Sequence, residues 1–353
     1  MNRMNLIGKE NGQPVTQTSE GNKSIILPSV DFVLGQNFVV GIPGLTLNEE
    51  TKKFLQQIKP AGVILYSRNY QTRGQLESLI GALQEFARET TGYDYFIMID
   101  EEPGGATRLN LFKNVFDSGF PEWDRIEKDI KEMASAGINV NLAPLADFPF
   151  NEDTFIKRRI QAYTPEALSD FNRQFIALLQ ENNISATLKH FPGMGVFVDD
   201  PHKKLPHVNT GQGVLDESIK LFNYGIDADV NFIMTGHAVY DSIDPGVPAT
   251  LSKKITTDIL RDELNFDGLT ITDDLSDMPF ITGKKINLIE ATAESLKAGH
   301  NMVIFSHNPE NTLKIFEKLL QQSQKDEELK SVVEQNYRNV VFFKNEHSLS
   351  FTQ

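Results

Sequence analysis

Eight short apolar segments recur along the chain and constrain its fold more than any other feature. Each is rich in Val, Ile, Leu or Phe and is continuous rather than alternating, as in strands that are buried on both faces of a parallel sheet. The segments are Phe38–Ile42, Gly62–Tyr66, Tyr95–Ile99, Ile138–Leu142, Ile184–Leu188, Phe232–Met234, Leu269–Ile271 and Met302–Phe305. With helix-like segments between most of them and a length of 353 residues, they predict an α/β fold, a single-domain (β/α)8 TIM-type barrel. An open doubly wound sheet is the alternative, but no phosphate-binding glycine fingerprint follows the first strand.

The clearest helical pattern runs from Thr164 to about Glu181. Thr164 is a suitable N-cap, Pro165 fits the first helical position, and one apolar stripe follows. Similar patterns occur around residues 76–87, 124–136, 255–264 and 288–297, and a final packing helix is expected over 326–341. We therefore expect a tail or irregular wrap over residues 1–30, the barrel over 31–345 and a C-terminal tail over 346–353.

Charge and composition exclude several classes of function. The chain has 34 Lys and Arg against 48 Asp and Glu, a formal net charge of −14, which argues against nucleic acid or an anionic membrane surface as a partner. It has no Cys, which excludes disulfides and thiolate chemistry. Its first thirty residues lack the apolar core of a secretory signal, and no run is long enough to span a bilayer. We expect a cytoplasmic protein, either a monomer or a weak dimer.

Polar side chains lie shortly after the ends of six of the eight apolar segments. They are Arg68, the acidic run Asp100-Glu101-Glu102, Asp147, the pair Lys189 and His190, His237, and the pair Asp273 and Asp274. In a barrel these positions converge on the C-terminal face, where active sites lie. This convergence favours an enzyme over a structural barrel.

Asp273 is the first candidate for chemistry. A carboxylate at a strand end in a barrel mouth can act as a nucleophile, a general base or a metal ligand. The alternative is that Asp273 and Asp274 cap the start of a helix. We expect both, with Asp273 pointing inward and Asp274 serving the structure.

Asp200 and His202 form the second candidate, in a loop that follows Gly193. A carboxylate can hold an imidazole in one tautomer, and such a pair transfers protons near neutral pH. The alternative is a surface histidine in a charged loop beside Lys203 and Lys204.

Lys189 and His190 are charged residues at the end of a buried strand, where they need a partner. Substrate groups would serve, and so would internal ion pairs with Asp147 or Asp100. A metal site is disfavoured, because His190, His202, His207 and His237 match no compact ligand spacing. We expect neither a metal nor another cofactor.

At these residues the chain resembles glycoside hydrolase family 3, and within it the bacterial β-N-acetylglucosaminidases (β-hexosaminidases) of cell-wall recycling. The resemblance extends from about residue 34 to residue 306. The matching segments are Ala61–Tyr70, Asp100–Arg108, Lys189–Gly193, Asp200–His202, Met234–His237 and Phe266–Leu275.

The resemblance implies a retaining exo-glycosidase that removes terminal β-linked N-acetylglucosamine from peptidoglycan-derived fragments. It makes Asp273 the nucleophile and His202, oriented by Asp200, the acid/base. It also implies a set of sugar-binding residues, namely Asp100, Arg108, Arg158, Lys189 and His190. A family 3 β-glucosidase or phosphorylase, or a non-catalytic sugar-binding barrel, are the alternatives.

Three departures from the family pattern lie near the expected pocket. Met194 stands where the signature usually has a second His. Pro103 inserts a residue into the acidic–glycine element, in which Ala106 replaces an Arg, and Asp277 adds a residue after the Asp273-Asp274 pair. The expected nucleophile and acid/base are unchanged by these differences.

Overall fold

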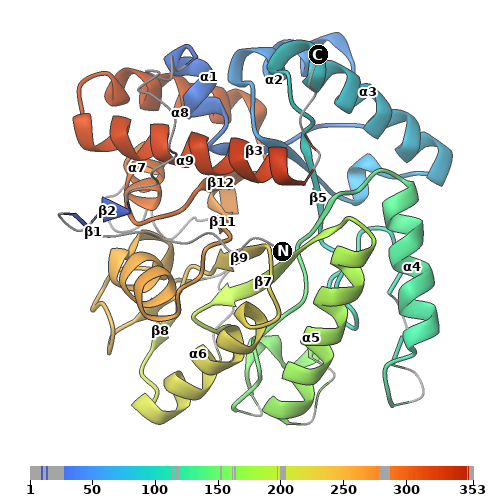
Figure 1. Ribbon diagram of the computed structural model, residues 1–353, viewed down its shortest axis with the longest axis vertical. Coiled ribbons are helices and arrows are strands. Elements are labelled where there is room, and N and C mark those ends of the chain that lie inside the picture. The colour runs from blue at the N-terminus through green and yellow to red at the C-terminus, as the bar shows by residue number, and fades with distance from the viewer. Residues whose placement is uncertain are drawn as a thin grey trace.

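The eight predicted strands form one closed parallel barrel (Figure 1), in the order β11-β12-β3-β4-β5-β6-β7-β9. The computed structural model describes residues 9–10, 13–14, 28–112, 115–116, 119–151, 153–160, 162, 164–196, 198, 204–277, 287–347 and 349. The barrel strands are β3 (Phe38–Gly41), β4 (Gly62–Leu65), β5 (Phe96–Ile99), β6 (Val140–Asn141), β7 (Ser185–Phe191), β9 (Phe232–Thr235), β11 (Leu269–Asp274) and β12 (Met302–Phe305). The predicted TIM-type barrel is confirmed.

Helices surround the strands and connect each to the next (Figure 1). They are α1 (Val30–Gly35), α2 (Glu49–Ile58), α3 (Arg73–Thr91), α4 (Trp123–Ser135), α5 (Pro165–Glu181), α6 (Gln212–Ile226), a π-helix (Lys254–Glu263), α7 (Leu288–Lys297), α8 (Pro309–Ser323) and α9 (Glu327–Glu346). Thr164 caps α5 through the backbone N–H of Ala167, with Pro165 in the first turn, as predicted. Helices α1 and α9 each extend one residue beyond the expected barrel boundaries.

Short elements complete the described fold. Strands β1 (Lys9–Glu10) and β2 (Gln13–Pro14) pair with each other, and β8 (His207–Val208) pairs with β10 (Val239–Tyr240). The 3₁₀ helices are Ser67–Asn69, Phe155–Arg159, Met194–Val196, Ala249–Leu251 and Leu275–Asp277. Among the described residues, no helix has both the length and the apolar character needed to cross a membrane.

Strands β7 and β11 are longer than predicted, and most of their extra residues carry polar side chains. We expected Lys189 and Asp273 to follow their strands, but both lie within them. The pairing of each extended strand with a neighbour shifts register in this region, between Lys189 and Phe191 and between Ile271 and Asp274. Buried charges are tolerated there because their partners come from the segments that follow other strands, as described below.

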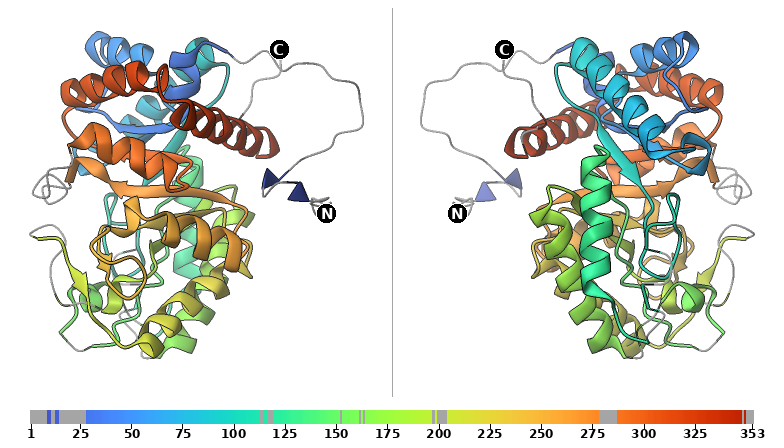
Figure 2. Two further views of the ribbon diagram at one scale, coloured as in Figure 1. Left: turned by 90° about the vertical axis from the view of Figure 1, so that its left-hand side faces the viewer. Right: turned by 90° about the vertical axis from the view of Figure 1, so that its right-hand side faces the viewer.

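Helix α9 closes the end of the barrel at which the strands begin (Figure 2). The ring of Phe343 lies 5.9 Å from that of Phe96 and 5.1 Å from that of Phe232, centroid to centroid. These rings belong to the apolar interior of the barrel. This end is therefore packed, which leaves the opposite end for a site.

Lys344, the residue after Phe343, is fully buried at this closed end. Its Nζ donates to the Ala61 carbonyl at 2.8 Å and to Gln36 Oε1 at 3.3 Å, and it lies 4.9 Å from the centre of the Phe96 ring. Burial lowers the pKa of the Lys344 ammonium from 10.5 to about 7, although the Asp94 carboxylate acts in the opposite direction.

We expect Lys344→Met to change how stability depends on pH. Between pH 7 and 10.5 the unfolded chain keeps the Lys344 proton and the folded chain loses it, so folding becomes more favourable as pH rises through this window. The free energy of unfolding of the wild type, minus that of the variant, should rise across it. Urea unfolding at several pH values measures this, with the exposed Lys314→Met as a control for net charge. A difference that stays flat with pH would contradict the prediction.

Candidate active site

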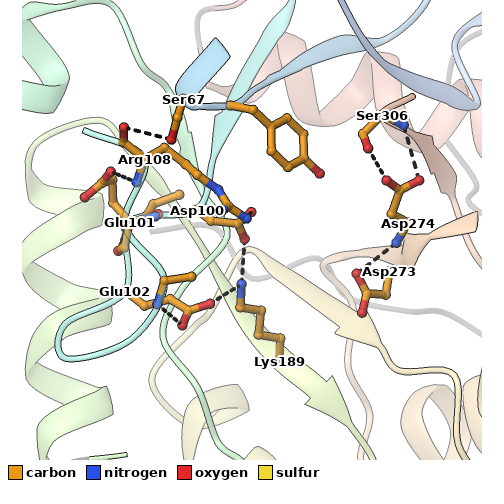
Figure 3. Close-up of polar contacts among 12 residues, drawn as sticks. Ser67, Asp100, Glu101, Glu102, Arg108, Lys189, Asp273, Asp274 and Ser306 are labelled. Atoms are coloured by element: carbon orange, nitrogen blue, oxygen red, sulfur yellow. Dashed lines mark hydrogen bonds and ion pairs between the residues drawn. The ribbon is translucent and has the colours of Figure 1, made fainter. Parts of the chain in front are cut away.

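The C-terminal strand ends bring the predicted polar residues to one barrel mouth, in two groups (Figure 3). Asp100, Arg108 and Lys189 lie on one side of the view, and Asp273 and Asp274 on the other. The strand order explains this separation, because β5 and β11 are on opposite sides of the barrel.

An array of alternating charges occupies the first side. Lys189 is only 2% exposed and its Nζ lies 2.7 Å from Asp100 Oδ1 and 2.8 Å from Glu102 Oε1. Arg108 pairs with Asp100 at 3.0 Å, and Arg159 with Glu102 at 2.5 Å. Burial alone would raise the pKa of Glu102, but Lys189 and Arg159 hold it well below its ordinary value. Glu102 therefore stays charged at neutral pH, between two cations that both contact it.

Glu101 shapes the loop that carries Arg108. It is fully buried, and its Oε1 accepts the backbone N–H groups of Arg108 and Leu109. Its own backbone exchanges two hydrogen bonds with the Asn141 side chain. Burial raises the pKa of Glu101 to about 7, against the effect of the two N–H groups. Sequence reasoning assigned no role to Glu101 or Glu102, although their position after a buried strand was a usable signal.

Asp273 and Asp274 differ in their surroundings, as expected. The Asp273 side chain is 38% exposed, and its Oδ2 lies 3.9 Å from His190 Nε2. Asp274 is buried and accepts hydrogen bonds from the backbone of Ser276 at 2.9 Å and from the backbone and hydroxyl of Ser306. Asp274 thus serves the structure, while Asp273 faces the mouth.

Asp273 is ionised at neutral pH. Desolvation acts to raise its pKa, but Coulombic interactions with His190, His237 and Lys189, together with the Asp274 backbone N–H, lower the pKa to about 2. His237 is itself held by neutral groups. Its Nε2 lies 3.2 Å from the Asp274 carbonyl oxygen, and its Nδ1 lies 3.2 Å from Thr250 Oγ1. Burial lowers the pKa of His237.

Both Lys189 and His190 have the internal partners that the sequence left open. Lys189 pairs with Asp100, and His190 Nδ1 lies 2.7 Å from Asp147 Oδ2. The two side chains are only 2% and 5% exposed, so these pairs hold them in place.

Arg158 is not brought together with the other predicted residues. It is exposed, whereas its neighbour Arg159 reaches Glu102. Both residues lie in the 3₁₀ helix Phe155–Arg159, in which neighbours point about 120° apart because a turn takes about three residues. The structure therefore places Arg159, rather than Arg158, in the array.

Asp200 and His202 lie outside the described residues. The described chain before them passes through Gly193, whose φ is 127° and at which a Cβ atom would lie 1.8 Å from Ser218 Oγ. Only glycine fits such a position. After them, β8 pairs with β10, the strand that follows β9 along the chain.

The family follows from the whole length of the barrel. The sequence profile for the glycosyl hydrolase family 3 N terminal domain matches residues 27–341. The chain belongs to glycosyl hydrolase family 3. It is therefore a glycoside hydrolase by family, and the resemblance of its motifs to family 3 is confirmed.

Relatives and solved structures agree with this assignment. The chain is 28% identical over 288 residues to a β-hexosaminidase of Alkalilimnicola ehrlichii, a match that covers 77% of this chain and 81% of that protein. A family 3 β-N-acetylglucosaminidase from Paenibacillus has a TM-score of 0.81 at 25% identity over 93% of this chain, which spans only 64% of that longer protein. A β-N-acetylhexosaminidase from Beutenbergia cavernae has a TM-score of 0.78 at 26% identity, covering 90% of this chain and 99% of that one.

No metal centre is found in the part of the chain that the structure describes. No three His, Cys, Asp or Glu side chains there are grouped so that they could hold an ion.

Proposed function

We propose that this protein is a retaining exo-β-N-acetylhexosaminidase with Asp273 as its nucleophile. The observation that carries the proposal is the state of Asp273, an ionised carboxylate facing the barrel mouth beside His190. The names of the relatives support the choice of an N-acetylated amino sugar as substrate. We further propose that the sugar is a terminal β-linked N-acetylglucosamine of a peptidoglycan-derived fragment.

The proposed reaction has two steps. In the first, an Asp273 oxygen forms a bond to the anomeric carbon while the bond to the leaving oxygen breaks and His202, oriented by Asp200, gives that oxygen a proton. In the second, His202 takes a proton from water, whose oxygen attacks the anomeric carbon and releases Asp273. Two inversions retain the β configuration. Most glycosidases use a second carboxylate where His202 is proposed.

The charged array supports the proposal through its geometry. Asp100 can accept hydrogen bonds from sugar hydroxyls, and Arg108 and Lys189 can donate to them. Because these groups are already paired with one another, they are held in place before the sugar arrives, so less side-chain freedom is lost on binding.

One activity panel tests the function. Purified protein is mixed with the aryl N-acetyl-β-glucosaminide and the aryl β-glucoside, each with and without inorganic phosphate, and with a disaccharide of N-acetylglucosamine linked to a muramic acid derivative. We expect turnover of the acetamido substrates, with no dependence on phosphate. Preference for the plain glucoside would favour a β-glucosidase, and dependence on phosphate a phosphorylase. Calorimetric binding of N-acetylglucosamine without any turnover would favour a sugar-binding barrel.

A further inference from the structure

Within the described residues, the hydrogen bonds of the Asp147 carboxylate go to the segment that carries His190. It is fully buried in the segment that follows β6. Its Oδ1 accepts the Met194 backbone N–H at 2.7 Å, its Oδ2 lies 2.7 Å from His190 Nδ1, and both oxygens lie 3.1 Å from the His190 backbone nitrogen. One carboxylate thus fixes both the backbone and the ring of the same residue.

These contacts decide which ring nitrogen of His190 carries hydrogen. A carboxylate accepts hydrogen bonds, so the Nδ1 beside it must be an N–H donor. The ring therefore turns Nε2 toward the mouth, where it lies 3.9 Å from Asp273 Oδ2. The hydrogen bond made by one ring nitrogen sets the role of the other.

The charged and titratable groups around the His190 ring come from several strands. Asp147 follows β6 and contacts Nδ1, Asp273 on β11 lies 3.9 Å from Nε2, Lys189 precedes His190 on β7, and His237 interacts electrostatically with both Asp273 and His190. His237 is bonded to a carbonyl and a hydroxyl instead. Of the two histidines beside Asp273, His190 is the one that a carboxylate orients.

We propose that Asp147 is a positioning residue of the active site, which fixes the tautomer of His190 and aims its Nε2 at Asp273 and the sugar bound there. This proposal rests on the proposed function for its catalytic consequence. Asp147 does not touch the substrate and acts through His190. The 3.9 Å between Nε2 and Oδ2 is too long for a hydrogen bond between them, so both atoms remain available to a sugar hydroxyl that lies beside the pair.

Asp147→Asn is a sharp test, because the surrounding donors dictate how the amide must turn. The Met194 N–H needs an acceptor, so the amide oxygen takes the position of Oδ1 and accepts this hydrogen bond. The NH₂ group then takes the position of Oδ2 and points its hydrogens at His190 Nδ1. The ring can accept that hydrogen bond only by moving its own hydrogen to Nε2. The same substitution in a Ser-His-Asp triad imposes the wrong tautomer on the histidine.

Nitrogen NMR of ¹⁵N-histidine-labelled protein reads the tautomer directly, without substrate. His190→Gln identifies the His190 signals among those of seven histidines. We expect hydrogen on Nδ1 in the wild type and on Nε2 in Asp147→Asn at a pH where the ring is neutral. Asp129→Asn, which changes another buried aspartate on α4, is the matched control and should leave the signals unchanged. Hydrogen on Nε2 in the wild type overturns the proposal, even if Asp147→Asn fails to fold.

Kinetics supply the second readout. Asp147→Asn should lower kcat for the aryl N-acetyl-β-glucosaminide by about 10²- to 10⁴-fold, whereas Asp129→Asn should leave it unchanged. In a His190→Gln background the same change should cost little more, because Asp147 acts through His190. Full additivity of the two losses would overturn the proposal in favour of a purely structural role. If the wild type shows no turnover at all, the proposed function fails while the NMR result still decides this inference.

Discussion

Asp273→Asn is expected to lower kcat for an aryl N-acetyl-β-glucosaminide by on the order of 10⁴-fold, as loss of a group that reacts directly with substrate does in other enzymes. The amide has nearly the shape of the carboxylate but cannot form the glycosyl intermediate. Its oxygen can still accept the Asp274 N–H that Asp273 Oδ1 accepts at 2.8 Å, so the fold and KM should change little. Steady-state kinetics and thermal unfolding of the purified variant measure these quantities.

The neighbouring carboxylate provides a matched control. Asp274→Asn alters the buried bonds to Ser306 and Ser276, so it should lower stability by about 1–3 kcal/mol while the folded fraction keeps most of its turnover. A wild-type rate in Asp273→Asn would remove Asp273 from the mechanism. Loss of turnover in a fully stable Asp274→Asn variant would instead indicate that Asp274 is the nucleophile.

The barrel could be predicted from the sequence because its signals are local. Each strand is an unbroken apolar run between polar segments, and such runs identify buried strands without knowledge of their neighbours. Thr164 and Pro165 likewise specify the start of α5 by local hydrogen bonding and backbone geometry. The ends of β7 and β11 were missed for the opposite reason. A charged residue belongs in a buried strand only if a partner reaches it, and the partners of Lys189 lie after β5.

The site could be predicted only in part, because the type of a residue does not show where its side chain points in the fold. The resemblance assigned Arg158 to the sugar-binding set, and only the phase of the 3₁₀ helix shows that its neighbour Arg159 reaches Glu102 instead. Glu102 itself carries no local sign that it joins two cations from distant segments. The sequence suggests Asp147 as a possible partner of His190. The hydrogen bond that Asp147 accepts from the Met194 backbone N–H, however, depends on how the chain turns after β7.

Lys189→Met is expected to destabilise the protein by about 3–5 kcal/mol at neutral pH, the usual cost of removing one partner from a buried ion pair. Methionine fills much of the same volume but leaves Asp100 and Glu102, which the ammonium contacts at 2.7 and 2.8 Å, with one cation each. Urea unfolding measures the loss. Lys220→Met on α6, an exposed lysine paired with Glu217, is the control and should show no measurable change, because such surface pairs contribute little.

The pH dependence of this loss distinguishes a broken charge array from a simple packing defect. Lys189 helps to hold the pKa of Glu102 below its ordinary value of 4.5, so the stability it provides is present above that pH and is lost as pH falls and the carboxylate is protonated. The difference in the free energy of unfolding between the wild type and Lys189→Met should therefore be largest near neutral pH and become smaller in acid. Adding Glu102→Gln should cost less than the sum of the two single changes, since both disrupt the same contacts. A loss that is constant with pH and strictly additive would mean that the Lys189 ammonium does not pair with these carboxylates in solution.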